Sequence, residues 1–427
     1  MTWGLAQLNG GKPPSQHRTS SGRWGSLETA QSMFGALVAG GESIGWLQFS
    51  GPARTHSMEE GNLMKMLKGR VWVILALFAL VIAACGGDGT TDTTSAGTET
   101  TAAAAEEFTV GVSWNNYNEE RWAKWDEPAM KEAIEAGGGS YISADAGSSE
   151  EQQLADVENL ISQGADVLII LAQNVEAIRP AVASALEQGI PVIGYDRLIA
   201  DPGALYVTFD NVGVGRMMAE VIFEQVPTGN YIIIKGNGAD ANSDFLREGI
   251  EEVIGEAVAA GDITIVGETY TDNWDGALAQ THTDQFLTQA DDDVQAVISE
   301  NDGMATGVVA ALEARGLAGE VKVSGQDGDL AALNRVALGT QSVSVWKDAR
   351  ELGTAAGEAA VALAGGATLA DIEGTIQFDA DGTSMTSIFL DPHPITQDSL
   401  DLVVDAGWIS VEQLCDGVAA GSVSVCP

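Results

Sequence analysis

Histidine and cysteine are scarce in this 427-residue sequence, which contains four of the first and three of the second. The histidines are scattered along the chain, at positions 17, 56, 282 and 393. Their spacing indicates neither a metal-ligand cluster nor a Ser-His-Asp arrangement. We therefore expect this protein not to be an enzyme and to carry no cofactor.

Positive charge is also sparse. The sequence has 20 Lys and Arg against 61 Asp and Glu, a formal net charge of -41, and after residue 84 the balance is 13 against 57. A surface of this kind repels phosphate backbones, so we expect no nucleic-acid partner. The acidic excess keeps the protein dispersed but raises its self-repulsion unless salt screens the charges, and it says nothing about the fold.

The one long apolar run is short for a membrane span. It covers 14 residues, Val71 to Ala84, whereas a transmembrane helix needs about 20. Lys65, Lys68 and Arg70 precede the run and Cys85 follows it, a pattern that resembles the bacterial lipoprotein signal. We expect Cys85 to be lipidated and the protein to be exported and lipid-anchored on the outer face of the cytoplasmic membrane. An ordinary signal peptide or a membrane anchor with a chance cysteine is the alternative.

The segments around this run divide the front of the chain. Residues 1–63 have neither helical nor strand periodicity, and Met64 opens a conventional signal, so we expect 1–63 to be a non-native extension and 64–84 the signal peptide. Residues 85–107 are rich in Gly, Thr and Ala without apolar periodicity. That composition is typical of a flexible tether.

From Phe108 onward, short β-branched or aromatic runs alternate with segments of helical period. Strand alternating with helix predicts parallel sheets covered on both faces. With 45% hydrophobic residues, a chain of this length predicts two lobes rather than one core. The ten expected strands begin near residues 108, 140, 166, 191, 206, 231, 263, 294, 321 and 342.

Polar and aromatic residues follow the ends of these strands, where parallel sheets bind ligands. A sugar requires such a mixture, because its hydroxyls donate and accept hydrogen bonds while its C–H faces pack on flat rings. Taken singly, an Asp-Arg pair is more often a cap or a surface ion pair, and a tryptophan more often core packing. The hypothesis therefore depends on their repetition: Trp114, Asn115, Asn116, Asp196, Arg197, Asp210, Asn211, Asn237, Asp240, Asn242, Trp274, Asn301, Asp302, Gln326, Asp327 and Lys347.

Five stretches in order resemble one family: 120–122, 194–199, 209–215, 301–302 and 323–330. From Phe108 to about Leu390 the chain is similar to the type I periplasmic sugar-binding proteins, which serve ABC importers, and most of all to their xylose-binding members. The resemblance implies an α/β fold of two Rossmann-like parallel-sheet lobes joined by a three-crossover hinge, with the sugar in the cleft. The N-terminal lobe would comprise 108–209 and 342–388, and the C-terminal lobe 210–341 and 389–427.

The resemblance also implies which residues contact the sugar. In the first lobe Arg121 and Trp122 would do so, with Trp122 against a sugar face, and Asp196 and Arg197 would form the central hydroxyl-binding pair. The second lobe would supply a second stacking ring and five hydrogen-bonding groups: Trp274, then Asn242, Arg247, Asn301, Asp327 and Lys347. The chain departs from the xylose pattern at 114–118 and 237–244, which leaves the exact sugar open.

The C-terminal segment extends beyond the xylose-binding pattern and contains the other two cysteines. With Cys85 lipidated, Cys415 and Cys426 remain as a pair for a disulfide. Closing a loop of about a dozen residues would contribute about 3 kcal/mol. Two free buried thiols are the alternative.

The function implied is that of a monomeric extracytoplasmic lipoprotein that delivers a monosaccharide, xylose or a related aldose, to the permease subunits of an ABC-type importer. The alternative is a sugar sensor that presents its closed form to a receptor kinase or chemoreceptor. A transcriptional repressor of the same fold would need a basic helix-turn-helix where this chain has a lipoprotein signal. A glycosidase pair of carboxylates is compatible with composition, but the strand-end mixture of Asp, Arg and Asn suits hydroxyl binding better.

Overall fold

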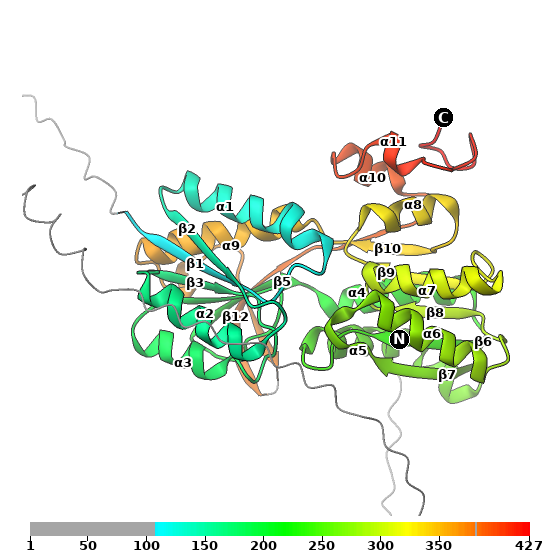
Figure 1. Cartoon of the computed structure of the whole chain (residues 1–427), viewed down its shortest axis with the longest axis horizontal. Coiled ribbons are helices and arrows are strands. Elements are labelled where there is room, and N and C mark those ends of the chain that lie inside the picture. The colour runs from blue at the N-terminus through cyan, green and yellow to red at the C-terminus, as the bar shows by residue number, and fades with distance from the viewer. Residues whose placement is uncertain (1–106, 381) are drawn as a thin grey trace, which may run out of the picture. The chain divides into compact units, whose positions relative to one another are not determined.

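Two sheets organise the part of the chain that the structure describes, residues 107–380 and 382–427 of a computed structural model (Figure 1). The first sheet contains β1 (Thr109–Trp114), β2 (Ser140–Asp145), β3 (Val167–Ile170), β4 (Val192–Tyr195), β5 (Ala204–Phe209), β11 (Ile376–Ala380) and β12 (Thr383–Leu390). The second contains β6 (Gly229–Lys235), β7 (Ile263–Tyr270), β8 (Ala296–Ser299), β9 (Lys322–Gln326), β10 (Val343–Trp346) and β13 (His393–Ile395). All ten strands predicted from the sequence are present, so the α/β prediction of two parallel-sheet lobes is confirmed.

The first lobe has three layers. Its strands run in the order β11-β12-β5-β4-β3-β1-β2, and every neighbouring pair is parallel except β11 with β12. One face packs on α1 (Glu127–Ala136) and α9 (Ala349–Ala364), and the other on α2 (Glu150–Ser162) and α3 (Arg179–Glu187). Strands β3, β4 and β5 are buried along their whole length, because helices cover both faces.

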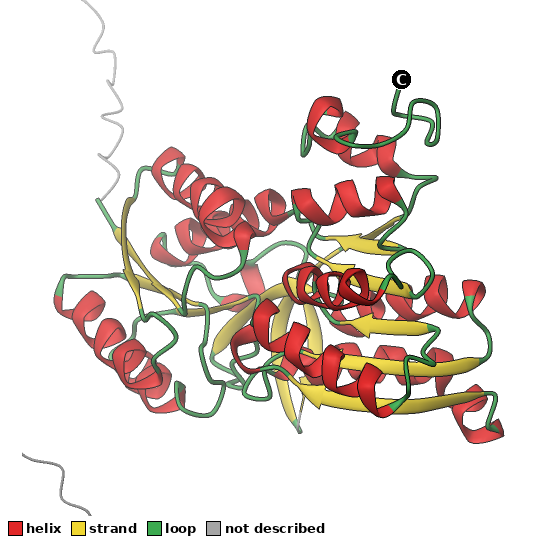
Figure 2. Cartoon of the chain, turned by 45° about the vertical axis from the view of Figure 1, so that its right-hand side comes forward, coloured by secondary structure: helices red, strands yellow, loops and turns green. Residues whose placement is uncertain are grey.

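The second lobe repeats this plan, with helices on both sides of its sheet (Figure 2). Its strand order is β13-β10-β9-β8-β6-β7, and only β13 is antiparallel to its neighbour. Helices α4 (Asn211–Gln225) and α5 (Ala241–Ala260) pair with each other, as do α6 (Gly276–Gln289) and α7 (Asp302–Arg315). Helix α8 (Leu330–Leu338) follows β9.

The chain passes between the sheets three times, after β5, after β10 and after β12. The predicted boundaries of the second and third passages were wrong. Residues 343–346 were assigned to the first lobe, but β10 pairs with β9 and β13 in the second sheet. The first-lobe segment instead begins with α9 and ends at Leu390, which lies opposite Phe209 in the pairing of β12 with β5. A fully buried strand such as β10 has the same apolar composition in either sheet, so its sequence does not identify its partner.

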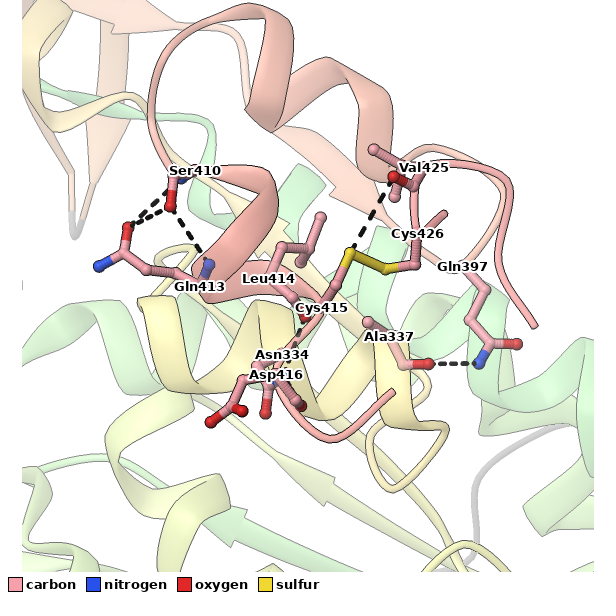
Figure 3. Close-up of a disulfide and its surroundings, with 10 residues drawn as sticks. All are labelled: Asn334, Ala337, Gln397, Ser410, Gln413, Leu414, Cys415, Asp416, Val425 and Cys426. Atoms are coloured by element: carbon pink, nitrogen blue, oxygen red, sulfur yellow. Dashed lines mark hydrogen bonds between the residues drawn. A yellow bond between two sulfur atoms is a disulfide. The ribbon is translucent and has the colours of Figure 1, made fainter. Parts of the chain in front are cut away.

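The C-terminal segment, residues 396–427, packs on α8 and β10 and contains the short helices α10 (Leu400–Asp405) and α11 (Val411–Leu414). Cys415 and Cys426 form a disulfide there, with their Cα atoms 5.6 Å apart (Figure 3). Within residues 107–380 and 382–427, no helix combines the length and apolar content needed to cross a membrane. The predicted extension, signal, lipidated Cys85 and nearly all of the tether lie outside the described residues.

Candidate functional site

Side chains from both lobes line a cavity at the carboxyl ends of the strands. Five lining residues come from the first lobe and seven from the second. They are Glu119, Arg121, Trp122, Asp196, Arg197, Asp240, Asn242, Trp274, Asn301, Gln326, Asp327 and Lys347.

Arg121 lies at the centre of the carboxylates and connects the lobes. Its guanidinium donates two hydrogen bonds to Asp126, at 2.7 and 3.1 Å, while Nη1 lies 3.2 Å from Asp196 and 3.5 Å from Asp327 of the second lobe. Burial disfavours the cation, but these carboxylates raise the pKa of Arg121 well above its usual value. The arginine therefore stays charged, and each carboxylate that it pairs with has a counterion inside the protein.

Arg197 makes a second connection between the lobes. Its Nη2 lies 3.2 Å from Glu119 Oε1 in the first lobe, and its Nε lies 2.9 Å from Asp240 Oδ2 in the second. The Nε–H does not point at Asp240, so among the described residues this buried donor has no hydrogen-bond acceptor. Burial raises the pKa of both carboxyl groups, and Arg197 opposes that rise. A buried donor without an acceptor at a cavity wall is a group that a ligand oxygen would satisfy.

Asp327 is held between two cations. Its Oδ1 lies 2.9 Å from Lys347 Nζ and 3.5 Å from Arg121. Burial alone would raise the pKa of Asp327, but Lys347 and Arg121 outweigh burial and hold the pKa below its usual value. Next to it in sequence, Gln326 has a buried Oε1 with no donor among the described residues. The second lobe thus offers an ionised carboxylate and a free amide acceptor to the cavity.

Two tryptophans contribute rings to the cavity wall. Trp274 donates its indole N–H to Asp240 Oδ2 at 3.2 Å, and its ring covers Gly236, where an added Cβ would come within 2.2 Å of the ring. Trp122 donates to Glu119 Oε2 at 2.7 Å, and the Arg121 guanidinium lies 4.3 Å from the centre of its ring. Hydrogen bonds fix the edges of both rings, and Arg121 already lies over one face of Trp122.

Asn242 begins the first turn of α5 and reaches across to the first lobe. Its Nδ2 donates to the Asp196 carbonyl at 3.1 Å, and its Oδ1 accepts from Tyr206 and Asn211 at 3.3 and 3.1 Å. Asp196 has a φ of 59°, in the left-handed region that non-glycine residues rarely adopt. The Asp196 backbone is therefore held by contacts from both lobes.

The structure brings together nine of the ten residues that the sequence assigned to the sugar. Arg247 is the exception, and its placement in the cleft was wrong. It lies outside the cavity wall, 20% exposed, where it pairs with Glu251 at 2.8 Å and Glu268 at 3.1 Å. Helix α5 places Arg247 more than one turn beyond Asn242, on a face directed to the carboxylates of α5 and β7.

Three lining residues were missing from the predicted site: Glu119, Asp240 and Gln326. Gln326 is the last residue of β9, and Asp240 lies five residues after β6 as the N-cap of α5. The sequence placed both among the polar residues that follow strands but did not assign either to the sugar. Glu119 lies in the loop after β1, beyond Trp114, Asn115 and Asn116, and was not among the polar residues that the sequence indicated there. Its side chain becomes part of the site only through Trp122 and Arg197.

The arrangement can bind a neutral, hydroxyl-rich solute. Carboxylates accept, guanidinium and ammonium groups donate, and amides do both, so each hydroxyl of a ligand can find a donor and an acceptor. In the part of the chain that the structure describes, no group of His, Cys, Asp and Glu has the geometry to hold a metal ion. Fold and cavity together define a two-lobed solute-binding protein.

Comparison with known proteins agrees with this class. The periplasmic binding protein domain matches residues 110–368, and the chain belongs to the type I periplasmic sugar-binding protein family, as its motifs indicated. It is 36% identical over 266 residues to the D-xylose-binding periplasmic protein of Escherichia coli, covering 62% of this chain and 80% of that protein. It is 28% identical to the multiple sugar-binding periplasmic receptor of Rhizobium radiobacter, covering 73% of this chain and 94% of that one.

Solved structures have the same fold. An ABC transporter solute binding protein from Clostridium phytofermentans with bound β-D-glucose superposes with a TM-score of 0.66 at 27% identity, covering 72% of this chain and 99% of that one. The relatives of this chain are sugar-binding transport proteins and not enzymes.

Proposed function

We propose that this chain binds a monosaccharide in the cavity between its lobes and delivers it to the permease subunits of an ABC-type importer. One observation carries the proposal: charged and amide side chains from both lobes converge on one cavity, together with two tryptophan rings. Two of its buried polar atoms, Arg197 Nε and Gln326 Oε1, lack partners among the described residues. A sugar hydroxyl could satisfy each of them.

Xylose or a closely related aldose is the proposed ligand. The similarity to the D-xylose-binding protein of Escherichia coli supports this choice. The proposed sugar contacts are the nine predicted residues that line the cavity, together with Glu119, Asp240 and Gln326. A site built this way rejects an analogue that lacks one hydroxyl, because its own polar groups would then be unpaired, at a cost of about 1 to 3 kcal/mol each.

Export and anchoring belong to the same proposal. Residues 64–84 would be the signal peptide, Cys85 the lipidated first residue of the mature protein and 85–107 a tether. The binding body would then remain near an importer at the outer face of the membrane as a monomer. Mass spectrometry of the exported protein tests this part: a diacylglyceryl group on Cys85 is expected, and a mature chain that retains residues 1–63 would contradict it.

The sugar is tested by titrating the purified protein with xylose, ribose, arabinose, glucose and galactose, following tryptophan fluorescence and calorimetry. We expect saturable binding of at least one aldose, with a fluorescence change that is smaller in the Trp274→Phe variant. The bound sugar should be recovered chemically unchanged. A folded protein that binds none of the five sugars would refute the proposed function.

A further inference from the structure

The C-terminal segment contacts the loop that carries Asp327. Trp408 in this segment is buried, and its indole Nε1 donates a hydrogen bond to the Gly328 carbonyl at 2.6 Å. Gly328 directly follows Asp327, the carboxylate that lies between Lys347 and Arg121 in the cavity. Trp408 does not line the cavity itself, so it reaches the site only through this loop.

Asp327 has a backbone conformation that non-glycine residues disfavour. Asp327 has a φ of 103° and Gly328 a φ of 74°, both in the left-handed region. For a non-glycine residue such a conformation costs about 1 to 3 kcal/mol and persists only when the surroundings enforce it. Contacts from outside the loop must therefore hold Asp327 in place.

Two side chains form hydrogen bonds with opposite ends of the same peptide in this loop. The Asp302 carboxylate accepts hydrogen bonds from the N–H groups of Gly328 at 3.0 Å and Asp329 at 3.1 Å. The peptide between Gly328 and Asp329 is therefore bound at both ends. Its carbonyl accepts a hydrogen bond from Trp408, and its N–H donates one to Asp302. With both polar ends engaged, rotation of this peptide would break one of the two hydrogen bonds. Asp327 directly precedes Gly328, and its own N–H donates to the Val345 carbonyl at 2.9 Å, so the backbone is held on both sides of the Asp327 side chain.

The indole ring of Trp408 is itself oriented by neighbours from both lobes. Trp346 meets it edge to face at 5.6 Å between ring centres, and Trp125 of the first lobe stacks on it at 4.6 Å. The Arg350 guanidinium lies 5.2 Å from its ring centre and donates to the Ala406 carbonyl at 3.1 Å. These contacts determine the plane of the ring and thus where its N–H points.

The segment that carries Trp408 is anchored to the helix that follows the loop. The Asn334 side chain of α8 donates hydrogen bonds to the carbonyls of Leu414 and Asp416, each at 2.9 Å. The disulfide between Cys415 and Cys426 links this part of the segment to the end of the chain (Figure 3). Loop, helix α8 and C-terminal segment thus form one connected structure.

We infer that Trp408 is a positioning residue for the sugar site: its N–H holds the 328–329 peptide and so aims the Asp327 carboxylate at the ligand. The inference rests on the proposed function, since it assigns Asp327 a ligand contact. It makes the C-terminal segment, which lies outside the matched family domain, a determinant of affinity.

A double-mutant cycle on affinity tests this role. Trp408→Phe keeps an aromatic ring but lacks the N–H, and we expect it to weaken binding of the sugar that the wild type binds by roughly 5- to 100-fold, as misalignment of one hydrogen bond to a charged group does. In an Asp327→Asn background the same change should cost less than about twofold, because the group that Trp408 positions is already altered. Calorimetry on all four proteins gives the coupling.

The controls separate positioning from general stability. Trp125→Phe keeps an aromatic ring stacked on Trp408, so the plane of the Trp408 ring and its N–H are retained and the affinity should change by less than about threefold. If Trp408→Phe does not fold, replacing Trp408 by its benzothiophene isostere, with sulfur instead of N–H, retains the ring shape. Equal affinity of wild type and Trp408 variant, or additive effects in the cycle, would overturn the inference. Failure of the wild type to bind any sugar would instead refute the proposed function.

Discussion

Arg197→Ala should weaken sugar binding about 30- to 4,000-fold, the equivalent of the roughly 2 to 5 kcal/mol that loss of one partner of a buried charged pair costs. The size follows from the partners of this side chain. Arg197 lies 3.2 Å from Glu119 and 2.9 Å from Asp240, so alanine leaves one carboxylate in each lobe without its cation. The variant also loses the buried Nε–H that no described residue accepts.

Arg247→Ala is the matched control, because the family resemblance assigned Arg247 to the same site and the structure does not. Its partners are Glu251 and Glu268 outside the cavity wall. We expect the affinity of this variant for the sugar to change by less than about twofold. Partly exposed ion pairs of this kind contribute about 0.2 to 1 kcal/mol to the stability of the fold and not to ligand binding.

The assay is isothermal titration calorimetry with the sugar that the wild type binds, at matched concentrations of folded protein checked by circular dichroism. Undiminished affinity of Arg197→Ala would refute its place in the site. A loss in Arg247→Ala as large as that in Arg197→Ala would show that the resemblance, rather than the cavity geometry, had identified the contacts.

Three further predictions concern stability in urea. The pKa of Asp327 lies below its ordinary value of 3.8, because Lys347 and Arg121 outweigh the rise caused by burial. Its carboxylate therefore stabilises the fold above the unfolded pKa and loses that effect as the pH falls through the folded pKa. The difference in unfolding free energy between the wild type and Asp327→Asn should narrow between about pH 5 and about pH 3. Replacing Cys415 and Cys426 by serine should lower the unfolding free energy by about 3 kcal/mol for a separation of 11 residues, and an unchanged midpoint would contradict this. With a net charge of -41, stability should rise between about 0.05 and about 2 M NaCl, and a flat salt dependence would argue against self-repulsion.

Local pattern was sufficient for most of the fold. Most of the ten predicted strands are short apolar runs bounded by polar or glycine residues, and this signal survives because central parallel strands are buried on both faces. Strands β11, β12 and β13 were missed, and β13 is only three residues long. β11 is largely exposed at the edge of the sheet, so it has no continuous apolar run, and β12 follows it directly as its antiparallel partner.

Site residues that stand one or two positions after a strand could be predicted from the sequence. Asp196, Asn301 and Asp327 are such residues, and the topology of parallel sheets brings these positions to one edge. Glu119 and Trp408 carried no such signal. Glu119 enters the site through its contacts with Trp122 and Arg197, and Trp408 reaches it through the Gly328 carbonyl, 80 residues away in sequence.

The amino-acid sequence alone determined the alternation of strand and helix, the two-lobed class and most of the polar residues at the strand ends, because these depend on the periodicity of neighbouring residues. The tertiary structure decided which sheet β10 joins, that Arg247 faces away from the cavity, and which side chains hold Asp327. Those features depend on distances between residues far apart in the chain, and such distances follow only from packing in three dimensions.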